Sequence, residues 1–498
     1  MEIPARELEE GFDELMVRLR QVFRNESGFR MARNYIRGLL SPIERKNGWQ
    51  MSECLGAVPP YALQQFLYRG RFSANGLRDE LRWYVGKKLG QADGVFVMDD
   101  TGFLKQGEKS CGVKRQYTGT AGKITNCQIG VFLTYASSVG HTPIDRRLYL
   151  PEEWCEDKER RRAAGVPDEA TFQTKPQMAL EMIQSAHDAG IPWAWMTGDC
   201  AYGDYRAIRQ WLEEHGKFYV LCISGKENLW RGMKQVRVSE ILKSLPEEGW
   251  FEASCGDGSK GARVYDWMCF DLNQSVAEGF TRSMLVRRSK TDPEDLQAYL
   301  CYAPQNTPVE KLVHTAGTRW TVECCFAEAK SEVGMDQYEV RSFNGWYKHI
   351  TLACMALALL TVLSAYSMDT KTFQAHNPAS HSLDAFKKGR GVCKNYRVGK
   401  KRQEERTREG IAVDEYIHRG WRYYQRSCPL GGYGNAGERP ERRAGFLTGT
   451  DGCGRPFSVP GRTKAINSPA TRADGLGRGV PTGRAPDPSF GNEPSIFS

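Results

Sequence analysis

The order of apolar segments between residues 94 and 224 constrains the fold more than any other feature. Three strand-like segments come first, and two helix–strand pairs follow. This order predicts a mixed sheet flanked by helices, an α/β architecture. The strands are expected at 94–100, 126–138, 143–151, 193–199 and 217–224, and the helices at 175–190 and 204–216.

Residues 1–90 read as helical, because apolar residues recur at helical spacing, for example at Phe12, Leu15 and Leu19. Two interpretations of this N-terminal domain stay open. It could be a small DNA-binding module whose arginines face phosphates, or a helical cap whose arginines are solvated. The arginines concerned are Arg69, Arg71, Arg78 and Arg82.

The chain from about 225 to 305 returns to a β pattern and is expected to be an all-β insertion, followed by helices at 318–333 and 343–367. The stretch 350–368 is almost long enough to span a membrane. It carries threonines and serines, and no second such stretch exists in the sequence. We therefore expect a buried core helix and no membrane association.

Charge is distributed unevenly along the 498 residues. Residues 371–498 hold 23 basic and 12 acidic residues, a balance of +11, whereas residues 1–370 balance at −2. The overall charge of +9 therefore does not by itself indicate a nucleic-acid ligand. The Gly, Pro and Arg content of 369–498 predicts a disordered tail, because such a composition buries too little apolar surface to fold.

The 15 cysteines form no Cys-x-x-Cys pair, and no histidine spacing is typical of a zinc site. The N-terminus has acidic residues and no apolar signal core. We expect reduced thiols and a cytoplasmic protein.

Acidic residues stand where core elements end or turn. Asp99 and Asp100 end one predicted strand, Asp199 ends another, and Glu323 lies on a late helix. A single acid at a strand end is usually a solvated residue or a helix cap. Acids at three such places are what two Mg²⁺ ions require, namely oxygen ligands with positions left open for water and phosphate.

The helix that carries Glu323 presents a mixed charged face. At 100° per residue, Arg319, Glu323 and Lys330 fall within roughly 40° of one another. The alternative interpretation is an Arg–Glu surface pair worth a few tenths of a kcal/mol.

Other chemistries lack their residues. The segment GTAGKIT at 119–125 has no phosphate-loop glycine spacing and no Ser or Thr directly after Lys123. No Gly-x-Ser-x-Gly elbow exists for a hydrolase triad.

Four blocks, in order, resemble the DDE-type transposases of bacterial insertion sequences over residues 30–367. They are MDDTGFLKQGEKSCGVKRQYTGTAGKITNCQIGV, IDRRLYLPEEW, TGDCAYGD and RWTVECCFAEAKSEVGMDQYEVRSFNGWYKHITLA. The resemblance implies an RNase H-like core within 91–368 and a metal-binding triad of Asp99 or Asp100, Asp199 and Glu323. It also implies a nucleoid-associated bacterial enzyme that acts as a homodimer on terminal inverted repeats and target DNA.

The last block is also similar to the Y-R-E-K signature of these enzymes. Arg319, Glu323 and Lys330 match it, whereas Ala316 stands at the tyrosine position. In related enzymes the β-rich insertion can hold an aromatic side chain that stacks on a flipped base. The candidates are Trp230, Trp250 and Trp267.

The resulting hypothesis is a DNA endonuclease and strand transferase that uses two Mg²⁺ ions, with Mn²⁺ able to substitute, and that binds DNA phosphate through Arg319 and Lys330. Two alternatives stay open. One is an RNase H-like nuclease without strand joining, and the other is an inactive DNA-binding remnant of a transposase.

Overall fold

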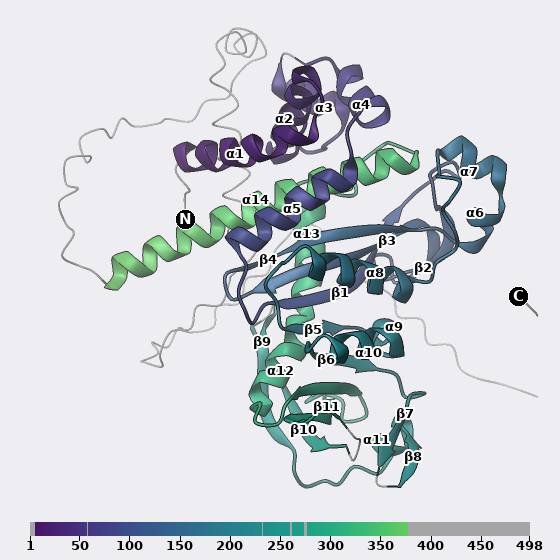
Figure 1. The fold of residues 1–498 in the computed structure, drawn as a ribbon, viewed down its shortest axis with the longest axis vertical. Coiled ribbons are helices and arrows are strands. Elements are labelled where there is room, and N and C mark those ends of the chain that lie inside the picture. The colour runs from purple at the N-terminus through teal and green to yellow at the C-terminus, as the bar shows by residue number, and fades with distance from the viewer. Residues whose placement is uncertain (1–4, 57, 232, 259–260, 273–275, 377–498) are drawn as a thin grey trace, which may run out of the picture. The chain divides into compact units, whose positions relative to one another are not determined.

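The computed structural model describes residues 5–376, apart from 57, 232, 259–260 and 273–275 (Figure 1). The expectation of a disordered tail therefore falls mainly outside the described residues. Residues 369–376, expected to begin that tail, are the end of a long helix, α14 (Phe343–His376).

A mixed sheet forms the core and contains each strand expected between residues 94 and 224. Antiparallel pairs join β1 to β3 and β3 to β4, while β1 and β5, and then β5 and β6, pair parallel. This is the arrangement expected of an RNase H-like core. The strands are β1 (Val95–Leu104), β2 (Lys114–Thr118), β3 (Lys123–Ser137), β4 (Gly140–Tyr149), β5 (Trp195–Gly198) and β6 (Phe218–Ile223).

The insertion extends this sheet. Its last strand, β12, pairs antiparallel with β6, and the sheet continues in the order β12-β11-β10-β9. The insertion is β-rich, but it is not all-β as expected, because a short helix lies within it. Its elements are β7 (Asn228–Arg231), β8 (Lys234–Arg237), α11 (Val238–Lys243), β9 (Phe251–Gly258), β10 (Gly261–Asp271), β11 (Phe280–Arg288) and β12 (Leu296–Pro304).

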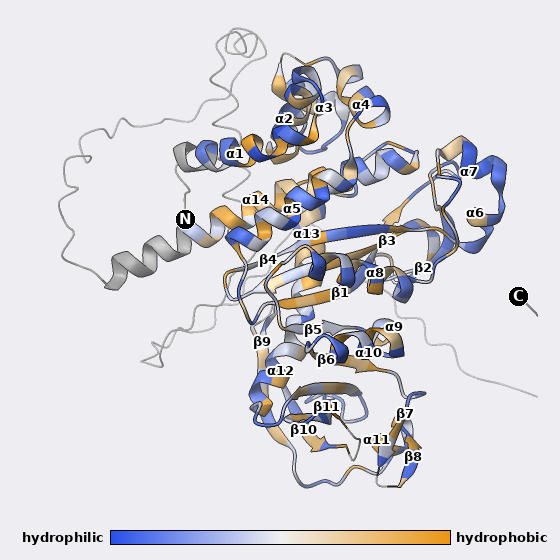
Figure 2. Cartoon of the chain, viewed as in Figure 1, coloured by the Kyte–Doolittle hydropathy of each residue, from blue (hydrophilic) through white to orange (hydrophobic). Residues whose placement is uncertain are grey.

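Helices cover the core sheet, and the strands and helices of this region differ in polarity. Hydrophobic residues run along β1, whereas α7 is largely hydrophilic (Figure 2). The helices after the first strands are α6 (Glu152–Glu156), α7 (Lys158–Ala164), α8 (Lys175–Asp188), α9 (Cys200–Gly203), α10 (Arg206–Glu214), α12 (Val309–Thr318) and α13 (Trp320–Ser331).

Helix α14 is the core helix expected from the apolar stretch at 350–368. It packs against β4 and against the N-terminal helices α1, α2, α4 and α5 (Figure 1). Its part from Phe343 to Tyr366 is long and apolar enough to cross a membrane, yet 89% of the apolar window is buried inside the protein. The apolar character of this helix is therefore explained by its burial between the N-terminal helices on one side and the sheet on the other.

The N-terminal region is helical, as expected. Its 15-residue helix α2 begins after Asn25, whose side chain accepts a hydrogen bond from the Gly28 amide. The elements are α1 (Ala5–Leu19), a short 3₁₀ turn (Arg20–Val22), α2 (Glu26–Leu40), α3 (Gly48–Leu55), α4 (Pro60–Arg69) and α5 (Ala74–Lys88).

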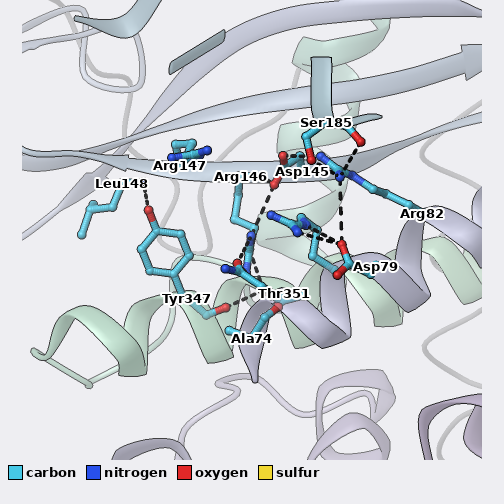
Figure 3. A network of polar contacts seen from close by, with 12 residues as sticks. Ala74, Asp79, Arg82, Asp145, Arg146, Arg147, Leu148, Ser185, Tyr347 and Thr351 are labelled. Carbon is cyan, nitrogen blue, oxygen red and sulfur yellow. Dashed lines mark hydrogen bonds and ion pairs between the residues drawn. The ribbon is translucent and has the colours of Figure 1, made fainter. Parts of the chain in front are cut away.

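A buried ionic network, which we call the Asp145 network, fixes α5 to the sheet (Figure 3). Arg82 on α5 donates to the Asp145 carboxylate at 2.6 Å and to the Ser185 hydroxyl at 2.8 Å. Arg146 donates to the Thr351 hydroxyl on α14 at 2.7 Å and to the Ala74 carbonyl at 2.9 Å. For Arg82 both interpretations are wrong, because this side chain is buried and bound to Asp145 and therefore neither faces phosphates nor is solvated.

Arg78, a second arginine considered for phosphate binding, is largely covered and donates to the neighbouring Asp79 carboxylate at 2.7 Å. Arg69 and Arg71, by contrast, are exposed. The two exposed arginines keep both interpretations of the N-terminal region open for that part of its surface.

Candidate active site

Two aspartates lie side by side at one edge of the parallel strands. Met98 of β1 stands opposite Gly198 of β5 in the register, and each is followed by an aspartate, Asp99 or Asp199. Burial and the Asp199 carboxylate raise the pKa of Asp99 to about 7, although Arg319 acts in the opposite direction. The proximity of these two carboxylates follows from strand register alone.

Asp199 begins α9, where its side chain accepts a hydrogen bond from the Ala201 amide at 3.0 Å. Burial, and after it the negative charge of Asp100, raises the pKa of Asp199. The edge therefore concentrates more negative charge than its surroundings neutralise.

Asp100 faces the opposite side of β1 from Asp99, since side chains alternate along a strand. Its carboxylate accepts a hydrogen bond from the Lys175 ammonium at 2.8 Å. Lys175 is the first residue of α8, whose start is fixed by a capping box between Thr174 and Gln177. Asp100 thus has a dedicated cation on the α8 side of the sheet.

Helix α13 brings Glu323 to the Asp99 side. Arg319, directly before this helix, donates to the Glu323 carboxylate at 2.8 Å and to the Asp99 carboxylate at 3.2 Å. The Arg–Glu pair considered from sequence does form, but its arginine also contacts Asp99. The helix expected at 318–333 is α13, and a further helix that the sequence did not predict, α12, ends directly before Arg319.

Lys330, about two helical turns after Glu323, also reaches β1. Its ammonium donates to the Thr101 hydroxyl at 2.8 Å, to the Thr120 hydroxyl at 3.2 Å and to the Gly102 carbonyl at 3.3 Å. Burial lowers the pKa of Lys330. Arg319, Glu323 and Lys330 therefore share one face of α13, as the helical spacing predicts, and that face lies on β1.

The side chains at this edge fit a divalent metal in kind. They are carboxylates, the hard oxygen donors that Mg²⁺ prefers. The raised pKa of Asp99 reflects burial first and, after it, repulsion from Asp199 that a cation would relieve. Within the described ranges, no group of three or more His, Cys, Asp or Glu side chains is gathered closely enough to hold an ion. Arg319 instead links Asp99 to Glu323, so its guanidinium takes the neutralising role here.

Sequence reasoning missed Lys175 and Thr120. Lys175 gives no signal, because only the fold brings it to Asp100. Thr120 lies in the GTAGKIT segment, which was excluded as a phosphate loop and instead forms the turn between β2 and β3. The available signal was a threonine directly after Gly119 and three residues before Lys123.

The three candidate tryptophans have different environments. Trp267 is 1% exposed, and its indole donates to the Ala253 carbonyl, so it packs in the insertion. Trp250 lies under the Arg288 guanidinium, 4.1 Å from its ring centre. Trp230 is 44% exposed on β7 and lines a 590 Å³ cavity with Arg206 of α10 and Arg282 of β11.

Comparisons with known proteins agree with this geometry. Residues 18–241 match the family described as DDE superfamily endonuclease, and residues 164–359 match the family described as transposase DDE domain. The chain is also 23% identical, over 315 residues, to a probable transposase for insertion sequence element IS701 from Microchaete diplosiphon. That alignment covers 61% of this chain and 75% of the relative. The chain therefore belongs to the DDE-type transposases of insertion sequences.

Proposed function

We propose that this transposase cuts DNA at the ends of its element and joins those ends to target DNA. One observation carries the proposal. Asp99 and Asp199 stand side by side on parallel strands, and Glu323 is held beside Asp99 by Arg319. Three carboxylates from distant parts of the chain at one edge suit phosphoryl transfer, in which the protein positions the reactants and neutralises charge.

Asp99, Asp199 and Glu323 would hold two Mg²⁺ ions, with Mn²⁺ as a substitute. When bound, the ions supply charge neutralisation at the phosphate and make a metal-bound water more acidic. Arg319 has to release at least one of its two carboxylate partners for these side chains to turn toward a shared cation. The guanidinium is then free to contact the DNA phosphate.

Asp99 is proposed as the ligand rather than Asp100. Asp99 shares the face of β1 that contacts α13, whereas Asp100 is paired with Lys175 on the other face. Comparing Asp99→Asn with Asp100→Asn tests the assignment. We expect the first to lose cleavage and the second to keep at least about a tenth of it; the reverse ranking would make Asp100 the ligand.

Arg319 and Lys330 are proposed to bind phosphate, and the enzyme is proposed to belong to the Y-R-E-K branch despite Ala316. Both cations lie on the β1 side of α13, close to the carboxylates. Ala316 is buried in α12, so the tyrosine contact of that signature is missing here. Replacing either cation by alanine should weaken binding to cleaved ends and reduce its salt dependence.

The N-terminal helices are proposed to contribute a DNA contact through α3 and α4. Three aromatic side chains, Trp49, Tyr61 and Tyr68, are exposed on these helices, and Arg69 and Arg71 follow them. Trp230 is the remaining candidate for stacking on a flipped base. Terminal inverted repeats, target DNA and a homodimeric complex complete the proposal.

The test uses the full chain, a labelled duplex carrying both ends of the element, a plasmid target and Mg²⁺. Cut and joined products support a transposase, cut products alone support a nuclease without strand joining, and binding alone supports an inactive remnant. The sequences that flank the gene supply the end duplex.

A further inference from the structure

The hairpin formed by β2 and β3 curls over β1 beside Asp99, Asp199 and Glu323, which we call the carboxylate edge. Thr120, in its turn, accepts a hydrogen bond from the Gly102 amide at 3.3 Å and lies 3.2 Å from the Lys330 ammonium. Thr118 is buried against Gly102, where any Cβ would collide with the threonine hydroxyl. Glycine at 102 is therefore required for the hairpin to lie on the strand that carries Asp99 and Asp100.

The outer face of this hairpin is apolar and exposed. Tyr117 and Ile124 stand directly opposite each other in the register, yet they are 64% and 62% exposed. Cross-strand aromatic and β-branched pairs of this kind usually support a sheet by packing on it. An exposed pair next to a reaction centre instead indicates a surface that is covered when a partner binds.

The charges around the pair favour a polyanion. Arg115 lies on the same face as Tyr117, two residues away, and Lys123 precedes Ile124 at the turn. Both cations are exposed, and neither forms an ion pair with a described residue. Lys114, on the opposite face, is instead neutralised by Glu153 at 2.6 Å. Arg115 on the face of the apolar pair and Lys123 at the turn therefore form no ion pair with a described residue, whereas Lys114 on the opposite face is paired.

We propose that the outer face of the β2–β3 hairpin, formed by Arg115, Tyr117 and Ile124, is a contact surface for duplex DNA next to the bond that reacts, together with Lys123 at the adjoining turn. Arg115 and Lys123 contact the phosphates on either side of the Tyr117–Ile124 pair, which packs against sugars and base edges. Because Thr120 ties the same hairpin to Lys330, docking of DNA on the outer face is transmitted to the phosphate-binding lysine. This inference rests on the proposed function for its substrate but concerns a separate surface.

The binding test measures the affinity for a labelled random-sequence duplex at several salt concentrations. Each lost phosphate contact lowers the slope of log affinity against log salt by about 0.9. We therefore expect Lys123→Gln to lower it by about 1, and Arg115→Gln combined with Lys123→Gln by about 2. Lys87→Gln, which changes an exposed unpaired lysine on α5, is the matched control and should leave the slope unchanged. Equal slopes in all the variants would overturn the inference.

The reaction test uses Tyr117→Ala combined with Ile124→Ala, with Val17→Ala on α1 as the control for an exposed apolar side chain. We expect the rate of cutting or joining to fall at least about fivefold in the double variant, while its unfolding temperature stays unchanged. Loss in cutting of an end duplex assigns the surface to the element end, and loss only in joining a pre-cut end to a plasmid assigns it to the target. Wild-type rates in both assays would overturn the inference.

Two further outcomes are distinguishable. If the wild-type chain neither cuts nor joins, the proposed function fails, while the salt slopes still decide whether the hairpin binds DNA. If the double variant changes the sedimentation of the DNA-free protein, the surface is a contact between copies of the chain and the DNA inference is wrong.

Discussion

The Asp145 network and the carboxylate edge both combine carboxylates with arginines, but arginines outnumber carboxylates in the network and carboxylates outnumber arginines at the edge. In the network, one carboxylate accepts from Arg82 and Arg146, and all three side chains are almost fully buried. At the edge, Asp99, Asp199 and Glu323 have Arg319 as the shared cation, and the pKa of Asp99 rises to about 7. Buried charges that all have an oppositely charged partner build the fold, whereas an excess of partly buried carboxylates indicates a site.

The largest expected effect separates activity from stability at the edge. Asp199→Asn or Glu323→Gln should reduce cleavage at least about a thousandfold, because losing even one neutral donor at a reacting centre costs about 10²–10³. The unfolding temperature should not fall, since Asp199→Asn removes a repelling charge. Rates of end cleavage and thermal unfolding of each variant check this prediction, and wild-type cleavage in both would refute the site.

Asp145→Asn should have the opposite outcome. It leaves Arg82 and Arg146 buried without their anionic partner, which costs about 3–5 kcal/mol of the free energy of unfolding. Denaturant unfolding measures the loss. Glu181→Gln is the control, because Glu181 pairs with the neighbouring Arg147 at 3.0 Å in a more exposed position and should cost at most about 1 kcal/mol. Similar losses in the two variants would show that burial does not separate them.

A buried neutral group extends the comparison to pH. His349 of α14 lies 2.8 Å from the Tyr35 hydroxyl of α2, and burial lowers the pKa of His349 to about 4. The unfolded chain then binds the proton first, at an ordinary pKa near 6.5. Stability is therefore complete above pH 6.5 and is lost as the pH falls toward 4, by about 3 kcal/mol for this residue.

Denaturant unfolding between pH 7 and pH 4 measures this loss. Burial also lowers the pKa of His141 to about 4, so both histidines contribute to the slope. His349→Gln should remove about half of their combined contribution. An unchanged slope would mean that His349 is protonated in the folded protein.

The smallest expected effect concerns Thr120, which touches Lys330 without belonging to either charge group. Thr120→Val keeps the shape of the side chain but removes the hydroxyl that contacts Lys330 and Gly102. We expect cleavage to fall about tenfold at unchanged stability, with about the same salt slope for DNA binding. Thr120→Ser retains the hydroxyl and should restore most of the rate; failure of that rescue would assign the loss to packing.

The sequence predicts the centre of this molecule better than its edges. The apolar runs directly before Asp99 and Asp199 were predicted as strands, because a buried run bounded by turns and acids has few alternatives. The predicted end of the first strand was wrong, because β1 continues through Asp99 and Asp100 to Leu104. Strand β2 gives no such signal, because its sequence KRQYT is polar and only Thr118 is buried. Its pairing with β3 depends on the turn rather than on hydrophobic alternation.

Long-range charge pairing explains the other differences. Arg82 has the spacing of a helix residue that could face solvent, and nothing near it in sequence reveals Asp145, its partner 63 positions away. Helix α12 ends at Thr318 and α13 begins at Trp320, and of these two helices only α13 was predicted from periodicity. The position of Glu323 on the face with Arg319 and Lys330 was predictable, since local helix geometry decides it.

The route of the chain through the insertion also sets the order in which the enzyme is completed during synthesis. Both aspartates belong to strands that emerge early from the ribosome, but Glu323 follows β12, whose pairing with β6 leads the chain back through α12 to α13. Domains generally fold as their N-terminal parts appear. A nascent or prematurely terminated chain that stops within the insertion thus carries Asp99 and Asp199 without Glu323.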